Sequence, residues 1–334
     1  FLRHFHPDII HVHNEFGIGL SGVGIAKLLR VPLVYTLHTM YDEYIYYVAP
    51  APLVGMATRI SHRYIRIFAK SANEVTGPSL KCQAYIQGET GVDKEVNVIP
   101  NPVELDAFSP DRVTEEDKRA FREKYGIRPE ETIAVFVGRL GREKSADVLL
   151  DYWAQEIVPE DRLRLVIIGE GPELLNLQEQ VKRLGIQETV VFTGRVEHEA
   201  LPPYVASGDI YVTASLSDTN SISMLEGMAA GLPVLQRYDE LNKDQIREGV
   251  NGFVFHNAKE MASELRRVRD MSERDLRVLK TSVRQSVRNS GAQNLANYVC
   301  DVYNRILGGG EALDSFPHVE KSFQHRLWKV RRRK

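Results

Sequence analysis

Residues 132–144 have the sequence TIAVFVGRLGREK. The first six are apolar or β-branched without polar alternation, which predicts a strand buried on both faces of a parallel sheet. A glycine and a loop with two cations, Arg139 and Lys144, follow directly. Ser145 then stands where it would cap a helix over residues 145–155. The stretch therefore predicts the start of a βαβ unit.

The same order of elements repeats downstream. Further strands are predicted at residues 163–169 (LRLVIIG), 190–194 (VVFTG) and 209–215 (DIYVTAS). Helices are expected at residues 172–184, 221–230, 259–269, 273–287 and 292–307. Strands that alternate with helices indicate an α/β fold with a parallel sheet covered on both faces.

A second such region lies upstream. Residues 8–13 (DIIHVH) and 31–37 (VPLVYTL) flank a helical stretch at 19–30, which suits a right-handed βαβ unit, and strands are also expected at 73–76 and 96–99. The sequence PNP that follows punctuates strongly enough to end a domain. We predict domains at residues 1–105 and 106–290, and a carboxyl-terminal helix with a basic tail at 291–334 that returns to the first domain.

Composition narrows the class of protein. A chain of 334 residues suits two domains, and 43% hydrophobic residues with a net charge of -2 indicate a soluble globular protein. Two cysteines, Cys82 and Cys300, are too few for a disulfide framework. No apolar run approaches the roughly 18 residues that a membrane span needs. We expect a cytoplasmic protein.

The loops after the strands of the second region carry the candidate ligand contacts, because ligands bind beyond the carboxyl ends of open parallel sheets. Arg139 and Lys144, beside helix N–H groups, suit a diphosphate, although both are also ordinary solvated loop charges. Gly171 permits close backbone approach or simply forms a tight turn. The loop 194–196 (GRV) is placed to contact a nucleotide base through its backbone.

The most specific motif is residues 218–234, DTNSISMLEGMAAGLPV. It places one carboxylate, Asp218, in a loop and a second, Glu226, eight residues later on a helix. Such a pair can accept hydrogen bonds from sugar hydroxyls at two places, the transferred sugar and the ribose of a nucleotide. The alternative is structural, because Ser223 and Glu226 also match a capping box.

Taken in order, GRLGREK, IIGEGPE, VVFTGRV and DTNSISMLEGMAAGLPV resemble family 4 glycosyltransferases. The resemblance implies the GT-B architecture, with two Rossmann-like domains whose parallel sheets face a cleft. The first domain is incomplete, because the family's first strand and glycine-rich loop would precede residue 8; we expect that upstream sequence is missing. The resemblance implies these donor-binding residues: Arg139, Lys144, Gly171, Gly194, Arg195, Val196, Ser221, Ile222 and Glu226.

Residues 38–44 (HTMYDEY) resemble the family's catalytic-cleft histidine and acceptor loop. The resemblance implies that His38 and Asp218 are the catalytic residues, which orient and polarise without forming a covalent bond. It also implies retention of anomeric configuration. A strand-end histidine is otherwise more often structural. No metal is expected, because Asp-x-Asp is absent and a pair at His11 and His13 lacks a third ligand.

Two departures from the family pattern concern the donor. Asp218 replaces the usual Glu, and Ser221 replaces a common Gly, so either the donor geometry is altered or the protein is a nucleotide-sugar-binding protein with weak catalysis. Within the family, the motifs look most like bacterial diacylglycerol glucosyltransferases. This implies UDP-glucose as co-substrate, no further cofactor, and a lipid acceptor such as 1,2-diacylglycerol, with a soluble or polysaccharide acceptor as the alternative.

Two basic segments suggest contact with a membrane surface. Cationic side chains among apolar ones at residues 59–70 predict an amphipathic helix on an anionic leaflet, or else a packed helix with a solvated basic face. Residues 323–334 combine Phe323, Leu327 and Trp328 with basic residues and form a second possible membrane anchor. Binding of this tail to nucleic acid is the less favoured alternative. We expect peripheral attachment to the cytoplasmic membrane face and no nucleic acid.

Overall fold

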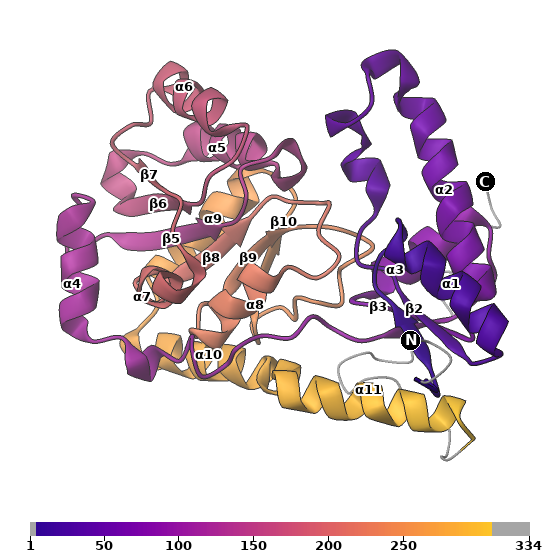
Figure 1. The fold of residues 1–334 in the computed structure, drawn as a ribbon. Helices are drawn as coiled ribbons and strands as arrows, with labels where there is room; N and C mark the ends of the chain where they lie inside the picture. The colour runs from indigo at the N-terminus through magenta and orange to yellow at the C-terminus, as the bar shows by residue number, and fades with distance from the viewer. Residues whose placement is uncertain (1–4, 309–334) are drawn as a thin grey trace. The chain divides into compact units, whose positions relative to one another are not determined.

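The computed structural model describes residues 5–308, which divide into two compact units (Figure 1). Unit 1 contains the described residues up to Asn101 and those from Gln293 onward, and unit 2 is Pro102–Ala292. Each unit is built on one parallel sheet with helices. The predicted α/β fold with two parallel sheets is confirmed. The basic end at residues 323–334 lies outside the described residues.

The sheet of unit 1 has four parallel strands in the order β1-β2-β3-β4. The strands are β1 (Ile10–Val12), β2 (Leu33–Thr36), β3 (Glu74–Gly77) and β4 (Val96–Val98). The helices are α1 (Ile18–Leu29), α2 (Val54–Ser71), α3 (Leu80–Tyr85) and α11 (Ala292–Ile306), with a π-helical turn at Ile86–Thr90. Three short 3-10 turns, η1 (Tyr41–Glu43), η2 (Ile45–Tyr47) and η3 (Ala51–Leu53), connect β2 to α2.

The core of unit 1 lies between its sheet and α2. All four residues of β2 are buried, and the ring of Tyr35 packs against Phe68 of α2 at 5.3 Å between centroids. Ile65 and Phe68 are fully buried in this core. Part of the apolar set predicted to face a membrane therefore holds the helix on its own sheet.

Helix α11 completes unit 1. The hydroxyl of Tyr303 lies 2.6 Å from Nδ1 of His11, and Tyr298 donates to Asn97 at 3.0 Å. Arg305 forms an ion pair with Glu74 at 2.6 Å. The last described helix is thereby tied to the strands β1, β3 and β4.

The sheet of unit 2 has six parallel strands in the order β10-β9-β8-β5-β6-β7. The strands are β5 (Thr132–Val137), β6 (Leu163–Ile168), β7 (Val190–Gly194), β8 (Ile210–Thr213), β9 (Val234–Arg237) and β10 (Gly252–Phe255). The last two strands were not predicted. The chain lays down β5, β6 and β7 in one direction and then returns to β8 on the other side of β5, so the order of strands reverses between β5 and β8. Such a reversal point is where open α/β sheets bind ligands.

The helices of unit 2 form a layer on each face of this sheet (Figure 1). One layer contains α5 (Ala146–Glu156), α6 (Leu174–Leu184) and α9 (Ala258–Arg269), and the other α7 (Leu201–Ala206), α8 (Ile222–Ala229) and α10 (Glu273–Ser286). Helix α4 (Glu115–Lys124) packs on α7. The layers leave the carboxyl ends of the strands to the loops.

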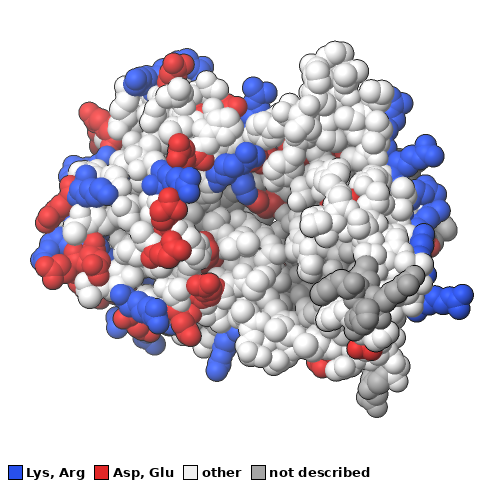
Figure 2. Space-filling view, in the orientation of Figure 1, with Lys and Arg blue, Asp and Glu red and all other residues white. Residues whose placement is uncertain are grey.

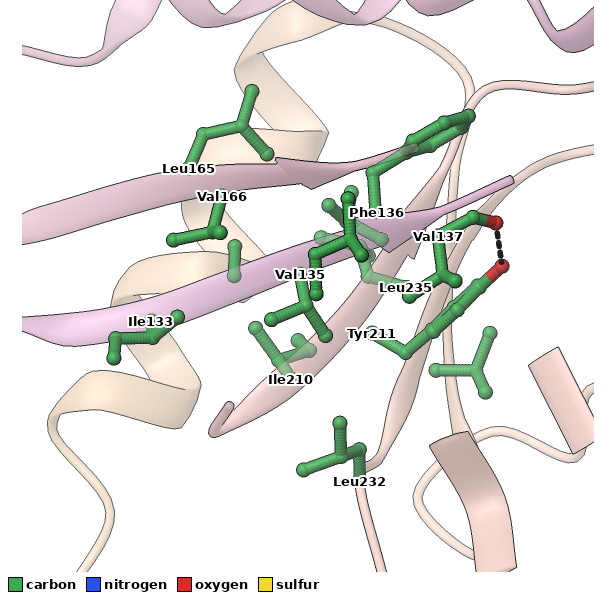
Figure 3. Packing of buried hydrophobic residues seen from close by; sticks show 14 of the residues in the cluster. Ile133, Val135, Phe136, Val137, Leu165, Val166, Ile210, Tyr211, Leu232 and Leu235 are labelled. Atoms are coloured by element: carbon green, nitrogen blue, oxygen red, sulfur yellow. Dashed lines mark hydrogen bonds between the residues drawn. The ribbon is translucent and has the colours of Figure 1, made fainter. Parts of the chain in front are cut away.

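Strand β5 runs through the middle of the core, flanked by the apolar side chains of β6 and β8 (Figure 3). The ring of Tyr211 on β8 is buried, and its hydroxyl donates to the carbonyl of Val137 at 3.3 Å. A Cβ atom on Gly227 would lie 2.8 Å from this ring. Glycine at this position therefore lets α8 lie directly on β8, and this contact fixes the height of α8 above the sheet.

Candidate functional site

A cavity of about 490 Å³ opens at the carboxyl ends of β5, β6 and β7. Three loops and the first residue of α7 line it: Val137, Gly138, Arg139, Ile168, Gly169, Glu170, Gly171, Arg195, Val196 and Leu201. Arg139, Gly171, Arg195 and Val196 were predicted as ligand contacts, and the structure brings them together here. Gly194 ends β7 in the left-handed region, at φ 75°, and its carbonyl accepts from the amide of Gly169 at 3.0 Å.

The glycines of the β6 loop are required by the neighbouring loop. A Cβ atom on Gly169 would lie 2.0 Å from the carbonyl oxygen of Gly138, and one on Gly171 would lie 2.4 Å from that of Leu140. The amide of Leu140 donates to Glu170 at 2.9 Å. The loops after β5 and β6 therefore pack backbone against backbone, and this packing accounts for Gly171 without a ligand. Helix α6 begins at Leu174, two residues later than predicted.

The two predicted cations of the β5 loop are both paired with carboxylates. Nζ of Lys144 lies 2.5 Å from Oδ1 of Asp218, and Arg139 contacts the buried carboxylate of Glu143 at 2.8 Å. The side chain of Lys144 is only 19% exposed, so it is not a solvated loop charge, whereas that of Arg139 is 51% exposed. Ser145 does stand at the start of α5, but it is left-handed (φ 49°) and its side chain makes no capping hydrogen bond.

The loop that carries Asp218 is held by the segment after β9. Asn242 donates to the carbonyl of Asp218 at 2.5 Å, and Gln245 donates to that of Thr219 at 2.7 Å. These two amides were not predicted as site residues, because nothing in the sequence links them to a loop more than 20 residues away. They fix the backbone from which the Asp218 carboxylate reaches Lys144.

Helix α8 begins differently from the capping-box alternative. Its N-cap is Ser221, whose hydroxyl accepts from the amide of Met224 at 3.4 Å, and Ile222 is its first residue, half exposed. Ser223 instead donates to the carbonyl of Val137 at 2.8 Å. The capping-box interpretation of Ser223 and Glu226 is therefore wrong, and Glu226 lies within the helix.

Glu226 is a buried carboxylate that pairs with a histidine. Nε2 of His198 lies 2.9 Å from its Oε1, and the Glu226 side chain is 6% exposed. Burial raises the pKa of Glu226, and the hydrogen bond from His198 opposes that rise. His198 belongs to the turn η8 (His198–Ala200) and was not predicted as a site residue. Its position shortly after the loop 194–196 was the one available signal.

In unit 1, His38 lies two residues after β2, beside His13, which directly follows β1. A hydrogen bond of 3.0 Å links Nε2 of His38 to Nδ1 of His13, and the rings are stacked. His11 is held between the hydroxyls of Tyr303 and Thr36, at 2.6 Å each. The structure thus joins His38 to His13, whose ring in turn lies 4.0 Å from that of His11 between centroids.

These histidines favour the neutral form. Burial, with a further contribution from the neighbouring histidines, lowers the pKa of His11 to about 3. The pKa values of His13 and His38 are also lowered, in both cases chiefly by burial. Among residues 5–308, no group of three or more His, Cys, Asp or Glu side chains is arranged to hold a metal ion.

The segment that follows His38 is anchored at two acidic side chains. Tyr41 and Tyr35 both donate to the buried carboxylate of Glu15, the latter at 2.5 Å. Asp42 accepts from His62 of α2 at 2.8 Å and from Tyr85 of α3 at 3.0 Å. Burial and the nearby carboxylates raise the pKa of all three tyrosines, so they remain hydroxyl donors.

Two family models match the sequence. The model described as Glycosyltransferase Family 4 matches residues 1–107, and the model described as Glycosyl transferases group 1 matches residues 117–282. The chain belongs to glycosyltransferase family 4. The predicted resemblance is thereby confirmed, and the loops after β5 to β8 lie within the second match.

Relatives of this family 4 chain differ in the acceptor that their names state. The chain is 30% identical over 263 residues to alpha-monoglucosyldiacylglycerol synthase of Streptococcus pneumoniae, and the match covers 79% of this chain and 59% of that protein. It is 30% identical over 325 residues to D-inositol 3-phosphate glycosyltransferase 2 of Catenulispora acidiphila, with 92% of this chain and 72% of that protein covered. The chain therefore spans less than two thirds of the first relative.

The fold of the family 4 chain is also that of a solved GT-B structure. Anabaena HepE in complex with UDP matches it with a TM-score of 0.74 at 18% identity, over 91% of this chain and 80% of that one. At this identity the likeness concerns the fold alone. It agrees with two Rossmann-like domains, each built on one of the parallel sheets described above.

Proposed function

We propose that the chain is the larger part of a retaining glycosyltransferase that transfers glucose from UDP-glucose to a lipid acceptor such as 1,2-diacylglycerol. The observation that carries the proposal is the set of charged groups at the reversal point of the second sheet. There, the Lys144–Asp218 ion pair and the buried Glu226 follow β5 and β8. A nucleoside diphosphate sugar needs a cation for its phosphates and acceptors for its hydroxyls, and these residues supply both.

In this proposal the nucleotide lies across the loops after β5, β6 and β7. The base enters the cavity of about 490 Å³ and meets the backbone of Arg195 and Val196. The diphosphate takes Lys144 as a partner in place of Asp218 and lies near the N-terminus of α5, where helix N–H groups favour anions. Glu226 accepts hydrogen bonds from the ribose.

The released Asp218 is then placed to accept from a hydroxyl of the glucose. The acceptor hydroxyl attacks the anomeric carbon from the face that the diphosphate leaves, so the new C–O bond forms where the old one breaks and the configuration is retained. The leaving phosphate oxygen takes the hydroxyl proton. Lys144, Arg139 and the helix dipole stabilise the charge that develops, and no metal ion is needed.

His38 orients and polarises in this scheme. Its lowered pKa keeps the imidazole neutral near pH 7, so that it can accept from or donate to a hydroxyl. The hydrogen bond to His13 and the anchored segment 41–42 hold it at the end of β2. A neutral imidazole that is held in place can form a hydrogen bond with a hydroxyl group, and this role does not require His38 to gain or lose a proton.

The lipid acceptor is supported by the surface around α2. No charged residue occurs from Tyr44 to Thr58, and Val48, Leu53 and Met56 are 84%, 45% and 50% exposed. Exposed cations follow along the helix: Arg59, Arg63, Arg66 and Lys70. On the face shown in Figure 2 the end of α2 that adjoins this segment is uncharged, and Lys and Arg side chains lie along the rest of the helix. An apolar end beside a basic stripe suits an anionic bilayer surface.

This surface would support peripheral contact rather than a span. No helix among the described residues is long and apolar enough to cross a membrane. The first relative carries diacylglycerol in its name, whereas the second carries a soluble inositol phosphate.

The test is to incubate the full-length protein with labelled UDP-glucose and either anionic vesicles that contain diacylglycerol or soluble acceptors. We expect label in the lipid fraction. The double variant Arg63→Glu, Lys70→Glu should lose this transfer to vesicles while its affinity for UDP is unchanged, because neither residue belongs to unit 2. Label found only in soluble products would refute the lipid acceptor, and donor binding without any turnover would support a binding protein instead.

A further inference from the structure

His198 and Glu226 form a pair in which the histidine is exposed and the carboxylate is buried. The His198 side chain is 53% exposed, that of Glu226 is 6% exposed, and 2.9 Å separate Nε2 from Oε1. A half-exposed imidazole that reaches a buried carboxylate is not needed to fill the core. It instead supplies a hydrogen bond to an acceptor that water reaches poorly.

The imidazole of His198 packs near a buried aromatic ring. Its ring lies 5.8 Å from the ring of Phe108, tilted by 59°, and Phe108 is 1% exposed. Since Phe108 is buried in the core of unit 2, it bounds the imidazole on one side. The direction in which Nε2 points is therefore set by packing as well as by the carboxylate.

The charges around the pair are almost all negative. Besides Glu226, the carboxylates of Glu104 and Glu199 act on His198 and raise its pKa, the hydrogen bond to Glu226 being the largest cause. Burial raises the pKa of Glu226, Glu104 raises it further, and His198 alone among these neighbours lowers it. The buried phenol of Tyr211 remains neutral because burial raises its pKa. His198 thus favours the charged form of Glu226.

We propose that His198 is a positioning residue for nucleotide recognition: its Nε2–H holds Oε1 of Glu226, so that the charged carboxylate presents its other oxygen to the ribose hydroxyls. This inference rests on the proposed role of Glu226 as the ribose acceptor. A carboxylate fixed by one donor loses less rotational freedom when it binds a second, so the hydrogen bond from His198 improves affinity for the nucleotide without touching it.

The experiment compares UDP with 2′,3′-dideoxyuridine diphosphate, which lacks both ribose hydroxyls, by calorimetry at pH 7.5. His198→Ala should weaken the binding of UDP roughly five- to tenfold, which is less than the loss of a direct hydrogen bond to a charged group because His198 does not touch the nucleotide, and should leave binding of the dideoxy compound unchanged. His198→Gln, whose amide can donate to Oε1, should recover most of the UDP affinity. His256→Ala, which removes the imidazole of another His–Glu pair of unit 2 (with Glu260, at 2.9 Å), serves as the matched control and should bind both nucleotides as the wild type does.

A pH series separates this role from a purely structural one. Without His198 the pKa of Glu226 is higher, so protonation of Glu226 on acidification begins at a higher pH. The UDP affinity of His198→Ala should therefore fall at a higher pH than that of the wild type. A melting curve for each variant checks that the protein remains folded.

The outcomes are distinct. An equal loss of UDP and dideoxy affinity in His198→Ala, or no loss of either, would overturn the positioning role while the wild type still preferred UDP. A wild type that binds both nucleotides equally would overturn the ribose assignment of Glu226 itself, and the role of His198 with it. Loss of UDP alone, with recovery in His198→Gln, supports the proposal.

Discussion

Replacing Asp218 by Asn should make UDP bind more tightly, although it should slow transfer of the sugar. In the ligand-free structure Nζ of Lys144 is engaged by Asp218 at 2.5 Å. If Lys144 binds the diphosphate, this ion pair competes with the nucleotide. Asn keeps the shape of Asp218 and can accept a hydrogen bond, but it lacks the charge that makes it a strong competitor.

The size of the effect follows from the nature of the contact. The amide introduced by Asp218→Asn would still accept a hydrogen bond from the charged Lys144, so only the attraction between opposite charges is lost, and the competition weakens by on the order of 1 kcal/mol. The pair is partly buried, with side chains 19% and 23% exposed, so solvent does not cancel the difference. Since about 1.4 kcal/mol is a factor of ten, UDP affinity should rise roughly fivefold.

The assay is titration of UDP into the wild type, Asp218→Asn, Lys144→Ala and the double variant, with a parallel measurement of kcat. Lys144→Ala should lower the affinity for UDP. In that background Asp218→Asn should change UDP affinity little, because the competing pair is already gone. Asp218→Asn should lower kcat in every case, because contacts that strengthen in the transition state act on rate. UDP affinity that is unchanged or weaker in the single Asp218→Asn variant would refute the competition.

Three further predictions concern His38, Glu226 and the core. His38→Ala should retain UDP affinity and lose at least about tenfold in kcat, since His38 belongs to unit 1 and the nucleotide contacts to unit 2; a parallel loss of UDP affinity would contradict this division. Glu226→Gln should weaken UDP by roughly 1.5–3 kcal/mol in calorimetry, and normal UDP binding would remove Glu226 from the nucleotide site. Gly227→Ala should lower the free energy of unfolding by about 1–2 kcal/mol, because the new Cβ would lie 2.8 Å from the Tyr211 ring, whereas Gly24→Ala, which meets nothing within 4 Å, should not destabilise in a denaturant titration.

The pH dependence of stability provides one more expectation. Arg266 holds the pKa of Asp161 at about 2, below its ordinary value of 3.8, through two contacts of 2.7 and 2.9 Å. A lowered carboxylate pKa stabilises the fold above pH 4, and this contribution is lost as the pH falls toward 2. Asp161→Asn should therefore be less stable at pH 7 by about 1–2 kcal/mol, and the difference should shrink on acidification. A difference that stays constant from pH 7 to pH 2.5 would show that the ion pair is not its cause.

The strands that surround the cavity could be predicted because each is a short apolar run that ends at a glycine or a polar loop. Strand β10 was missed although its sequence GFVF is itself a short apolar run beside a glycine, whereas β9 could not be predicted. Each has four residues, and β9 includes Gln236 and Arg237, so local hydrophobicity does not distinguish it from a loop. Its strand character depends on pairing with β8 and β10, which are remote in sequence.

The candidate site shows the same limit. The motif around Asp218 and Glu226 pointed to the loop after β8 and to α8, but the local capping rule chose Ser223, because two serines stand two residues apart. Ser223 is not the N-cap, because its hydroxyl donates to the carbonyl of Val137, 86 residues away. The partners His198 and Asn242 likewise meet their carboxyl and carbonyl groups only through the fold. Local rules cannot supply contacts of that kind.

Helix α11 has a consequence for the order in which the protein acquires its structure during synthesis. Unit 2 is one continuous segment, Pro102–Ala292, and can fold as it leaves the ribosome. Unit 1 cannot be completed then, because the partners of His11, Asn97 and Glu74 are Tyr303, Tyr298 and Arg305. The polar groups of these strand residues have no α11 partner until some 200 more residues after Asn97 have been translated. The residues of α11 thus complete the first unit only after the whole of the second has been translated.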